Sequence, residues 1–194
     1  MVNCSNLSSI YGNFLITGTR VFSGCSRLTI NSSNIYNNYP VISYPVPFVD
    51  NEYACNLEFA SSLNSTEEMF SGCSSLSGND FSMIMLLLHD NITNLSKMFL
   101  NCSSADAVIR YDVFRHCPNA INLSSFAEGA GIKGGIYSRA DTYSDEDTTT
   151  WGTFDFIRDV RSISNMFSNS GLQFLDNNLF APYIKNDSLT YFNI

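Results

Sequence analysis

The chain has 194 residues and a net charge of −8; only 14% of its residues are charged, whereas 44% are hydrophobic. Its length allows one domain with a sizeable core. With 10 basic against 18 acidic residues, it offers no basic surface for nucleic acid. We therefore expect one domain over residues 1–194, with a neutral polar surface of the kind found on extracellular or virion proteins.

The first residues, Met1–Cys4, lack the basic start and the apolar stretch of a signal peptide. The longest apolar run, residues 83–88, is far shorter than the roughly 18–20 residues that cross a membrane, and we predict a buried strand or short helix there. The expected location is extracellular, on a cell surface or on a virion, reached by export without a signal peptide or as part of a longer protein.

A phrase built on Met-Phe recurs along the chain. Met69 to Met98 is 29 positions, Met98 to Phe126 is 28 and Phe126 to Met166 is 40. Residues 6–11 look like an eroded first copy, and "VFSGC" follows at 21–25. A period of about 25–29 residues indicates a solenoid, in which each unit buries its apolar face against its neighbours. The aligned copies are 68–76, 97–105, 125–132 and 165–172.

Within one unit, Leu95, Met98, Phe99 and Cys102 stand at i, i+3, i+4 and i+7. This spacing predicts one buried face of a short helix, with a Ser or Asn before it as N-cap. A short strand and a second helical turn are expected to complete the unit. The predicted fold class is therefore an irregular α/β repeat, a leucine-rich-repeat-like solenoid of short helical turns and short parallel strands.

A second phrase, "DVFRHCPN" at 112–119, alternates with the first, and 21–25, 80–81 and 178–180 are read as its counterparts. Two stretches depart from the period. Residues 29–56 form a non-repeat insertion with three prolines, and residues 138–152 form a polar, acidic insertion loop.

The acidic insertion holds Asp141 and the run 145–147, whose order lacks the alternating ligands and central Gly of a calcium loop. We interpret it as a solvated loop. Trp151 follows it directly, and with Tyr137 and Tyr143 it could make an exposed aromatic patch of the kind that binds proteins or sugars. Trp151 could equally anchor the loop to the body. These three residues are the candidate recognition surface.

The six cysteines do not have the close spacing of a structural zinc site. Four of them follow a Phe by three residues, and the same slot holds Ala130 and Ser170 in other copies. We therefore interpret them as small buried side chains with reduced thiols. Cys4 and Cys55 fall outside this pattern, and they are the pair that would bridge if any pair does.

Catalysis by Cys117 with His116 is disfavoured, because adjacent side chains point different ways and no third orienting group is evident. His89 is the only other histidine. We expect no catalytic residues, no metal and no cofactor. The Asn-x-Ser/Thr sequons, such as Asn94-Leu95-Ser96 and 122–124, lie where repeats need turns, and we interpret them as turns rather than glycosylation sites.

The phrases "MFSGCSSL" and "NLSKMFLNC" resemble the BspA-like class of leucine-rich repeats in bacterial surface proteins, including the mycoplasma-lipoprotein type. The resemblance covers about residues 60–180, with a degenerate copy at 6–28. It implies a binding or adhesion surface and no enzymatic activity shared across the class.

The sequence therefore predicts a non-enzymatic repeat protein that presents a surface for protein or glycan recognition, on a bacterial surface or a phage particle. The alternative is a structural assembly subunit of a virion or other large complex, which docks or self-associates through uncapped solenoid ends. Residues 3–11 and 188–194, each part of a repeat, suggest this alternative. An enzyme built on the insertions is the weakest of the three hypotheses.

Overall fold

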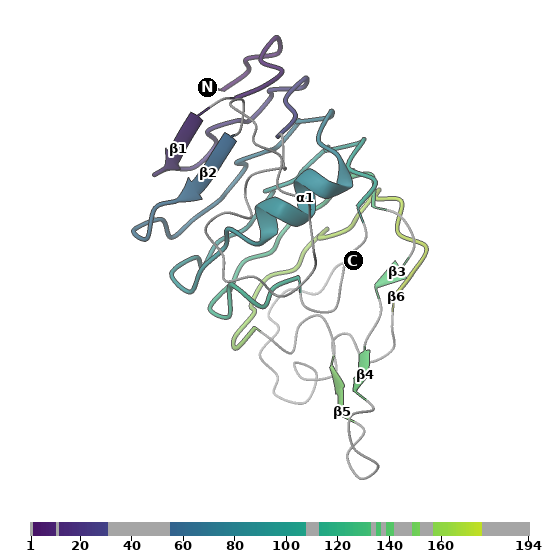
Figure 1. The fold of residues 1–194 in the computed structure, drawn as a ribbon. Helices are drawn as coiled ribbons and strands as arrows, with labels where there is room; N and C mark the ends of the chain where they lie inside the picture. Colours follow the sequence, from purple (N-terminus) through teal and green to yellow (C-terminus); the bar gives the residue numbers. More distant parts are fainter. Residues whose placement is uncertain are drawn as a thin grey trace.

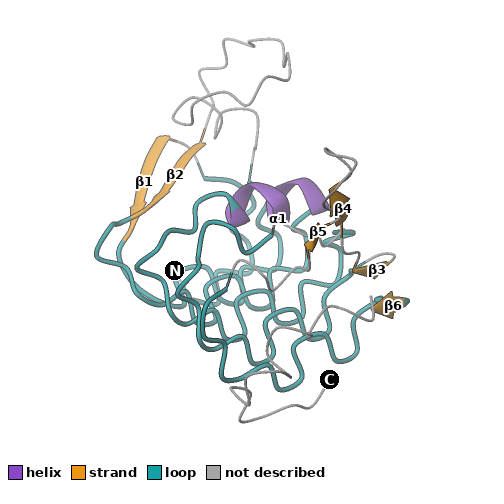
Figure 2. Cartoon of the chain, turned by 90° about the horizontal axis from the view of Figure 1, so that it is seen from below, coloured by secondary structure: helices purple, strands orange, loops and turns teal. Residues whose placement is uncertain are grey.

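The computed structural model describes residues 2–10, 12–30, 55–107, 113–132, 135–136, 139–141, 149–151 and 157–175. Most of both predicted insertions lies outside these ranges. Successive segments follow one another across the molecule in sequence order (Figure 1), and stacked loops form most of the body beside one helix (Figure 2). The elements are β1 (Gly12–Ile16), β2 (Cys55–Phe59), α1 (Gly78–Met85), β3 (Gly135–Ile136), β4 (Arg139–Asp141), β5 (Thr149–Trp151) and β6 (Phe174–Leu175).

Backbone hydrogen bonds join the repeated phrases into a stack. The Phe22 N–H donates to Met69 O at 3.0 Å, and the Phe70 N–H donates to Met98 O at 3.0 Å. The same bond recurs one segment further on, from Phe99 to residue 126 at 2.9 Å. Residues at corresponding places therefore form columns through the stack. The six stacked segments in the described chain are 3–8, 20–29, 65–76, 94–105, 122–131 and 162–171.

The strands that pair one repeated segment with another are short and parallel. β1 pairs with β2 from Gly12↔Cys55 to Ile16↔Phe59, and β3 pairs with β6. β4 and β5, within the acidic insertion, pair antiparallel. Between the other segments the pairing is reduced to single parallel bridges, because turns begin within a residue or two of each bridge. Three such bridges run through one column, at Ser65↔Asn94, Asn94↔Asn122 and Asn122↔Ser162.

Residues 95–102 form a run of turns, where the apolar spacing predicted a short helix. The Met98 N–H donates to Leu95 O at 3.2 Å, and the Cys102 N–H donates to Phe99 O at 3.2 Å. These bonds span three residues, whereas those of an α-helix span four. The four apolar side chains are all fully buried. The prediction of one buried face is therefore confirmed, and the prediction of a helix there is wrong.

Left-handed residues explain why the helix does not form. Each stacked segment after the first has two of them four residues apart, as at Glu68 (φ 53°) and Gly72 (φ 72°). A single left-handed residue breaks the α-helical pattern and makes a tight turn. The first left-handed column is Arg20, Glu68, Lys97, Ser125 and Asn165; the second, all Gly or Asn, is Asn3, Gly24, Gly72, Asn101, Gly129 and Asn169.

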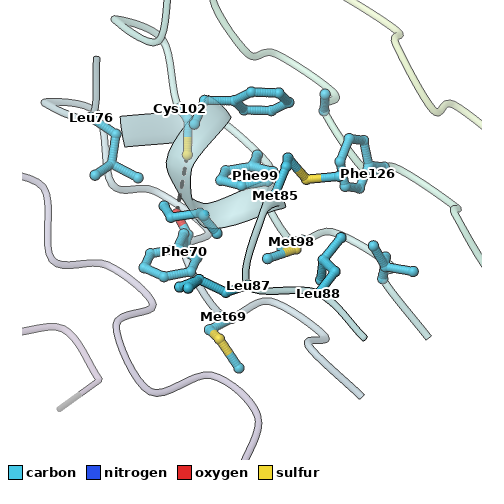
Figure 3. Close-up of a cluster of buried hydrophobic side chains, with 14 of the residues drawn as sticks. Met69, Phe70, Leu76, Met85, Leu87, Leu88, Met98, Phe99, Cys102 and Phe126 are labelled. Carbon is cyan, nitrogen blue, oxygen red and sulfur yellow. Dashed lines mark hydrogen bonds between the residues drawn. The ribbon is translucent and has the colours of Figure 1, made fainter. Parts of the chain in front are cut away.

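The core is a row of phenylalanines inside the stack. The Phe22 and Phe70 rings lie 5.5 Å apart, and the Phe70 and Phe99 rings 5.9 Å apart, both pairs stacked. The next segment has an alanine in this column, and its Phe126 meets Phe99 edge-on at 5.5 Å. Phe81 of α1 packs against both Phe99 (4.4 Å) and Phe126 (6.2 Å). Figure 3 shows three of these rings with the methionines around them.

The helix α1 is the only described α-helix, and it begins at a capping box. Ser77 accepts from the Asp80 N–H at 3.2 Å, and the Asp80 carboxylate accepts from the Ser77 N–H at 2.9 Å. Asp80 is only 3% exposed, and its burial raises the pKa of the carboxyl group although the hydrogen bonds from Ser77 oppose this. The apolar run 83–88 therefore starts in a capped, buried helix.

Glycines in the later segments stand where backbones approach closely. A Cβ on Gly131 would lie 2.3 Å from Ser103 O of the preceding segment, and one on Gly171 would lie 2.3 Å from Ile132 O. Real Cβ atoms do not come so near to a carbonyl oxygen, and the backbone cannot swing aside as a side chain can. A side chain at either position would push two segments apart.

We predict that Gly131→Ala lowers the free energy of unfolding by about 1–3 kcal/mol, because the added methyl group overpacks the contact with Ser103. Gly18→Ala is the matched control, since a Cβ at Gly18 meets nothing within 4 Å. It should leave stability unchanged or raise it slightly by restricting the unfolded chain. Urea unfolding followed by circular dichroism measures both, and equal effects would contradict the close approach.

We predict that Asp80→Asn changes how stability depends on pH. Because the folded pKa of Asp80 is raised, the native state binds this proton more tightly than the unfolded state does. The native protein therefore loses stability as the pH rises from the unfolded pKa through the folded pKa, and Asn removes this loss while its amide oxygen can still accept from Ser77. Urea unfolding between pH 4 and 7 should show the wild type losing stability relative to the variant as pH rises; a constant difference would refute it.

Candidate functional site

The predicted aromatic patch lies mostly outside the described residues. Tyr137 and Tyr143 are not described, and of Trp151 only the backbone is, as the last residue of β5. That backbone pairs with Arg139, in an antiparallel ribbon that runs to Asp141↔Thr149. The ends of the acidic insertion are therefore held together by strand pairing. The patch itself stays a prediction.

The described residues offer another candidate surface, formed by the outward side chains of the stacked segments. We call it the turn face. It contains the first left-handed column and those residues one or three positions before the column that are not buried. Because inner positions of each turn are filled mainly by apolar side chains, the outer ones carry what the molecule can present to a partner. Its central members are Asn94, Lys97, Asn122, Ser124, Ser125, Ser162, Ser164 and Asn165.

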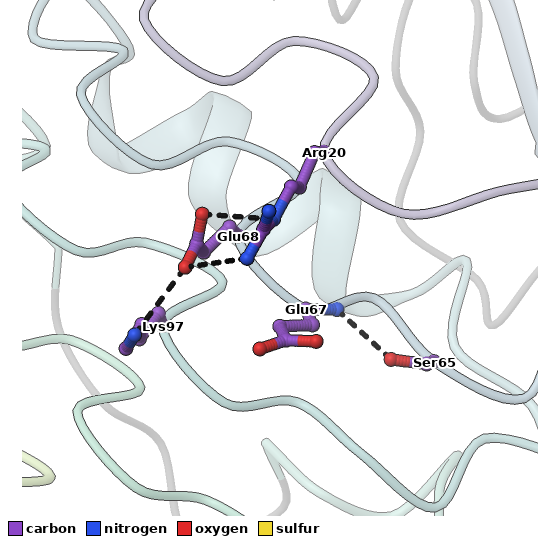
Figure 4. A network of polar contacts seen from close by, with 5 residues as sticks. All are labelled: Arg20, Ser65, Glu67, Glu68 and Lys97. Atoms are coloured by element: carbon purple, nitrogen blue, oxygen red, sulfur yellow. Dashed lines mark hydrogen bonds and ion pairs between the residues drawn. The ribbon is translucent and has the colours of Figure 1, made fainter.

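Three charged side chains on the turn face form one ion-pair network, with two cations around a single carboxylate. Arg20 Nε lies 3.0 Å from Glu68 Oε2, and its Nη2 donates to Glu68 Oε1 at 3.2 Å. Lys97 Nζ reaches the same Oε1 at 3.3 Å (Figure 4). All three stand in the first left-handed column, so stacking places a negative charge between two positive ones. Exposed pairs of this kind stabilise little, roughly 0–1 kcal/mol, and mainly orient the side chains.

The other end of the turn face is uncharged and rich in Ser and Asn. Asn94 Oδ1 accepts from the Ser96 N–H at 3.0 Å, and Asn122 Oδ1 accepts from the Ser124 N–H at 3.1 Å. These are side-chain turns of the kind that Asn favours. The interpretation of these two sequons as turns is therefore confirmed. Ser124 Oγ in turn shares a hydrogen bond with Ser162 Oγ, which links two segments.

The cysteines inside the stack form a ladder of hydrogen-bonded thiols. Cys73 Sγ donates to Phe22 O at 3.0 Å, and Cys102 Sγ donates to Phe70 O at 3.1 Å. The bond from Cys102 is drawn in Figure 3. Each thiol thus ties its segment to the preceding one. Cys25, Cys73, Cys102 and Cys117 are all fully buried, as the Phe-x-x-Cys pattern predicts.

Burial makes these thiols chemically inert. It raises the pKa of Cys73 to about 12, and it also raises that of Cys102. For Cys117 burial, followed by the negative charge of Asp90, raises the pKa to about 12. The thiolate is the nucleophile and the metal ligand, and almost none forms near pH 7 at such values. In addition, Cys117 Sγ donates to Phe114 O at 3.6 Å.

The structure changes two sequence assignments. Phe22 and Cys25 stack on Phe70 and Cys73, so "VFSGC" belongs to the first phrase and is no counterpart of 112–119. Cys4 was placed outside the cysteine pattern, yet the Asn3 N–H donates to Ser23 O at 2.6 Å, which sets Cys4 beside Cys25. The first copy is therefore residues 3–7, aligned on its cysteine. An alignment anchored on Gly-Cys or Asn-Cys would have found it.

His89 has a structural role that the sequence did not indicate. Its Nε2 lies 3.1 Å from Ala60 O, and its Nδ1 accepts from the Asn91 N–H at 3.3 Å. The tautomer with its proton on Nε2 satisfies both contacts. Asn91 Nδ2 also donates to Ser61 O at 2.8 Å. The imidazole thus joins two segments of the stack through their backbones.

No group of three or more His, Cys, Asp or Glu side chains among the described residues is placed to hold a metal ion. None of the described helices is long and apolar enough to traverse a bilayer.

We predict that the ladder thiols resist alkylation in the native protein, because they are buried and protonated. Cys4 is exposed and should react with iodoacetamide within minutes at pH 8. Site-resolved mass spectrometry, with and without urea, measures this. Rapid modification of Cys73 or Cys102 in the folded protein would contradict the packing interpretation, and the same residues in urea serve as the control.

No family model, curated protein or solved structure matches the chain.

Proposed function

We propose that this chain is a non-enzymatic repeat scaffold, a leucine-rich-repeat-like solenoid, whose outer surface recognises a protein or a glycan. The setting that fits the BspA-like phrase is attachment, on a bacterial surface or a phage particle. The recognition surface would comprise the turn face together with the aromatic residues of the acidic insertion, Tyr137, Tyr143 and Trp151.

One observation carries the proposal: the residues that pack the stack and the residues that face outward occupy different columns. The thiols and phenylalanines that give the repeat its signature are inside and fully buried. The outer columns vary from segment to segment, from Glu68 and Lys97 to Ser125 and Asn165. A scaffold that keeps the inside constant and varies the outside is suited to binding.

The chemistry of the turn face favours a neutral, hydrogen-bonding partner. Arg20 and Lys97 pair with Glu68, and Glu67 beside it supplies a second negative charge, so these four charges sum to zero and attract no strongly charged ligand from a distance. The remaining members are mostly hydroxyl and amide side chains, such as Ser125, Ser164 and Asn165, which both donate and accept. Hydroxyl-rich glycans and uncharged peptide segments offer matching groups.

The experiment compares two Ser→Lys variants on a glycan array and on whole bacterial and host cells. Ser125→Lys places a long charged side chain at the centre of the turn face, at a backbone conformation that Lys97 already adopts (φ 55° and 56°). Ser82→Lys makes the same chemical change at an exposed residue of α1 that is not a member of the turn face. Binding by the wild type should fall at least tenfold in Ser125→Lys and be kept in Ser82→Lys.

A third variant, Trp151→Ala, reports on the aromatic insertion in the same assay. If Trp151→Ala alone loses binding, the recognition site is assigned to the insertion and not to the turn face. Equal binding by all variants, or no binding by the wild type to any array member or cell, would count against recognition as the function. Melting temperatures of all variants confirm that they are folded.

The alternative function, a structural assembly subunit, is favoured by a different observation. Val2 (54% exposed) and Leu15 (59% exposed) are the large hydrophobic side chains exposed in the described chain, and both belong to its first segments. At the other end, no described group accepts from the backbone N–H groups of Asn165, Phe167 and Asn169, whose counterparts bond to the next segment. Light scattering on the same samples distinguishes the two functions. A particle size that increases with protein concentration, without binding to any glycan or cell, supports assembly.

A further inference from the structure

Cys4 and Cys25 stand side by side at the start of the stack. The Asn3 N–H donates to Ser23 O at 2.6 Å, and a Cβ on Gly24 would lie 3.1 Å from the Asn3 Cα. The two cysteines are the next residues on each segment. Both then begin the same turn, because the Leu7 N–H donates to Cys4 O at 2.9 Å and the Leu28 N–H to Cys25 O at 3.0 Å.

The spacing of hydrogen-bonded backbones suits a disulfide. Neighbouring strands lie about 4.7–4.9 Å apart, and disulfides join Cα atoms roughly 4.4–6.8 Å apart. Burial raises the pKa of the Cys25 thiol, and both the backbone and the thiol of the neighbouring Cys4 act on that pKa as well.

Among the described cysteines only Cys4 is open to an oxidant, and Cys25 is its neighbour in the ladder. Cys73 and Cys102 are fully buried between segments on both sides. Cys4 is exposed, and its thiol lies 3.9 Å from Val2 O. It also lies in the outermost described segment, which has a neighbour on one side only. That segment can shift by the fraction of an ångström that bond formation needs.

We propose that Cys4 and Cys25 form a disulfide bond that fastens the first stacked segment to the second. The oxidant is a small disulfide of the glutathione class. The Cys4 thiolate attacks one of its sulfurs, the small S–S bond breaks, and one thiol leaves with the proton that Cys4 lost. The Cys25 thiolate then attacks the Cys4 sulfur of this mixed disulfide, and the second small thiol leaves with the proton of Cys25. The two protein thiols together lose two electrons, which reduce the small disulfide to two thiols.

The second step is the slower one. Burial raises the pKa of Cys25, so its thiolate is scarce until the first segment loosens or the pH rises. Once formed, the bond closes the chain from residue 4 to residue 25 and removes conformations from the unfolded state. The oxidised protein is then held together at the end of the stack where Val2 and Leu15 are exposed.

The test incubates the full chain with oxidised glutathione at pH 8 and maps its thiols by mass spectrometry. The wild type should lose 2 Da and yield a peptide cross-linked between Cys4 and Cys25. Its melting temperature should rise by about 5 °C or more and return to the starting value with dithiothreitol. Cys55→Ser should behave as the wild type does, whereas Cys4→Ser should show neither the cross-link nor the shift.

Three results would overturn the proposal. A Cys4–Cys55 bridge, absent from Cys55→Ser, would assign Cys4 a different partner. A stable glutathione adduct on Cys4 would show that Cys25 cannot reach it, and a Cys4–Cys4 dimer would make it an intermolecular thiol. Cys4→Ser changes an exposed side chain and should fold, which circular dichroism checks. The experiment does not depend on whether the protein recognises a ligand.

Discussion

The backbone hydrogen bond between successive segments is the constraint on which the rest of this structure depends. Because the bonds from Phe22 to Met69 and from Phe70 to Met98 have the same length and place, each repeated residue must tolerate its counterpart in the next segment at close range. Aromatic rings meet this condition by stacking. Charges meet this condition by alternating in sign, and the second left-handed column meets it with Gly or Asn at every position. The sequence therefore repeats those residue types that can pack against their own counterparts in the next segment.

The sequence predicted which side chains are buried better than it predicted the backbone that buries them. Leu95, Met98, Phe99 and Cys102 are all inside, although no helix carries them. A helix and a run of tight turns both return the chain to the same side every three to four residues, so the apolar spacing alone does not separate them. The distinguishing signal was the Gly or Asn one residue before the cysteine slot, at Gly72, Asn101, Gly129 and Asn169. Two left-handed residues per segment are incompatible with an α-helix.

The register of the first segments could not be read from sequence for a different reason. The segment at Phe22 and the one at Phe70 are separated by the insertion 29–56, so their spacing of 48 does not match the later period. The residues on which the copies are aligned then decide which segments are recognised as repeats. With Met-Phe as anchor, Cys4 falls outside every copy. The backbone pairing of Asn3 with Ser23 places it in the cysteine column. Local similarity identifies a repeat, but only the contact between segments identifies which residues are neighbours.

That distinction also explains why the turn face was not predicted. Arg20, Glu68 and Lys97 are unremarkable as single residues, and in sequence the first two are 48 positions apart. They become one network because each stands in the same left-handed column, where the side chain points out of the turn. The columns that face inward admit few substitutes, as Ala130 and Ser170 show in the cysteine slot. The columns that face outward admit Arg, Glu, Lys, Ser and Asn alike. Selection for binding can therefore act on the outer columns without disturbing the hydrogen bonds that hold the stack together.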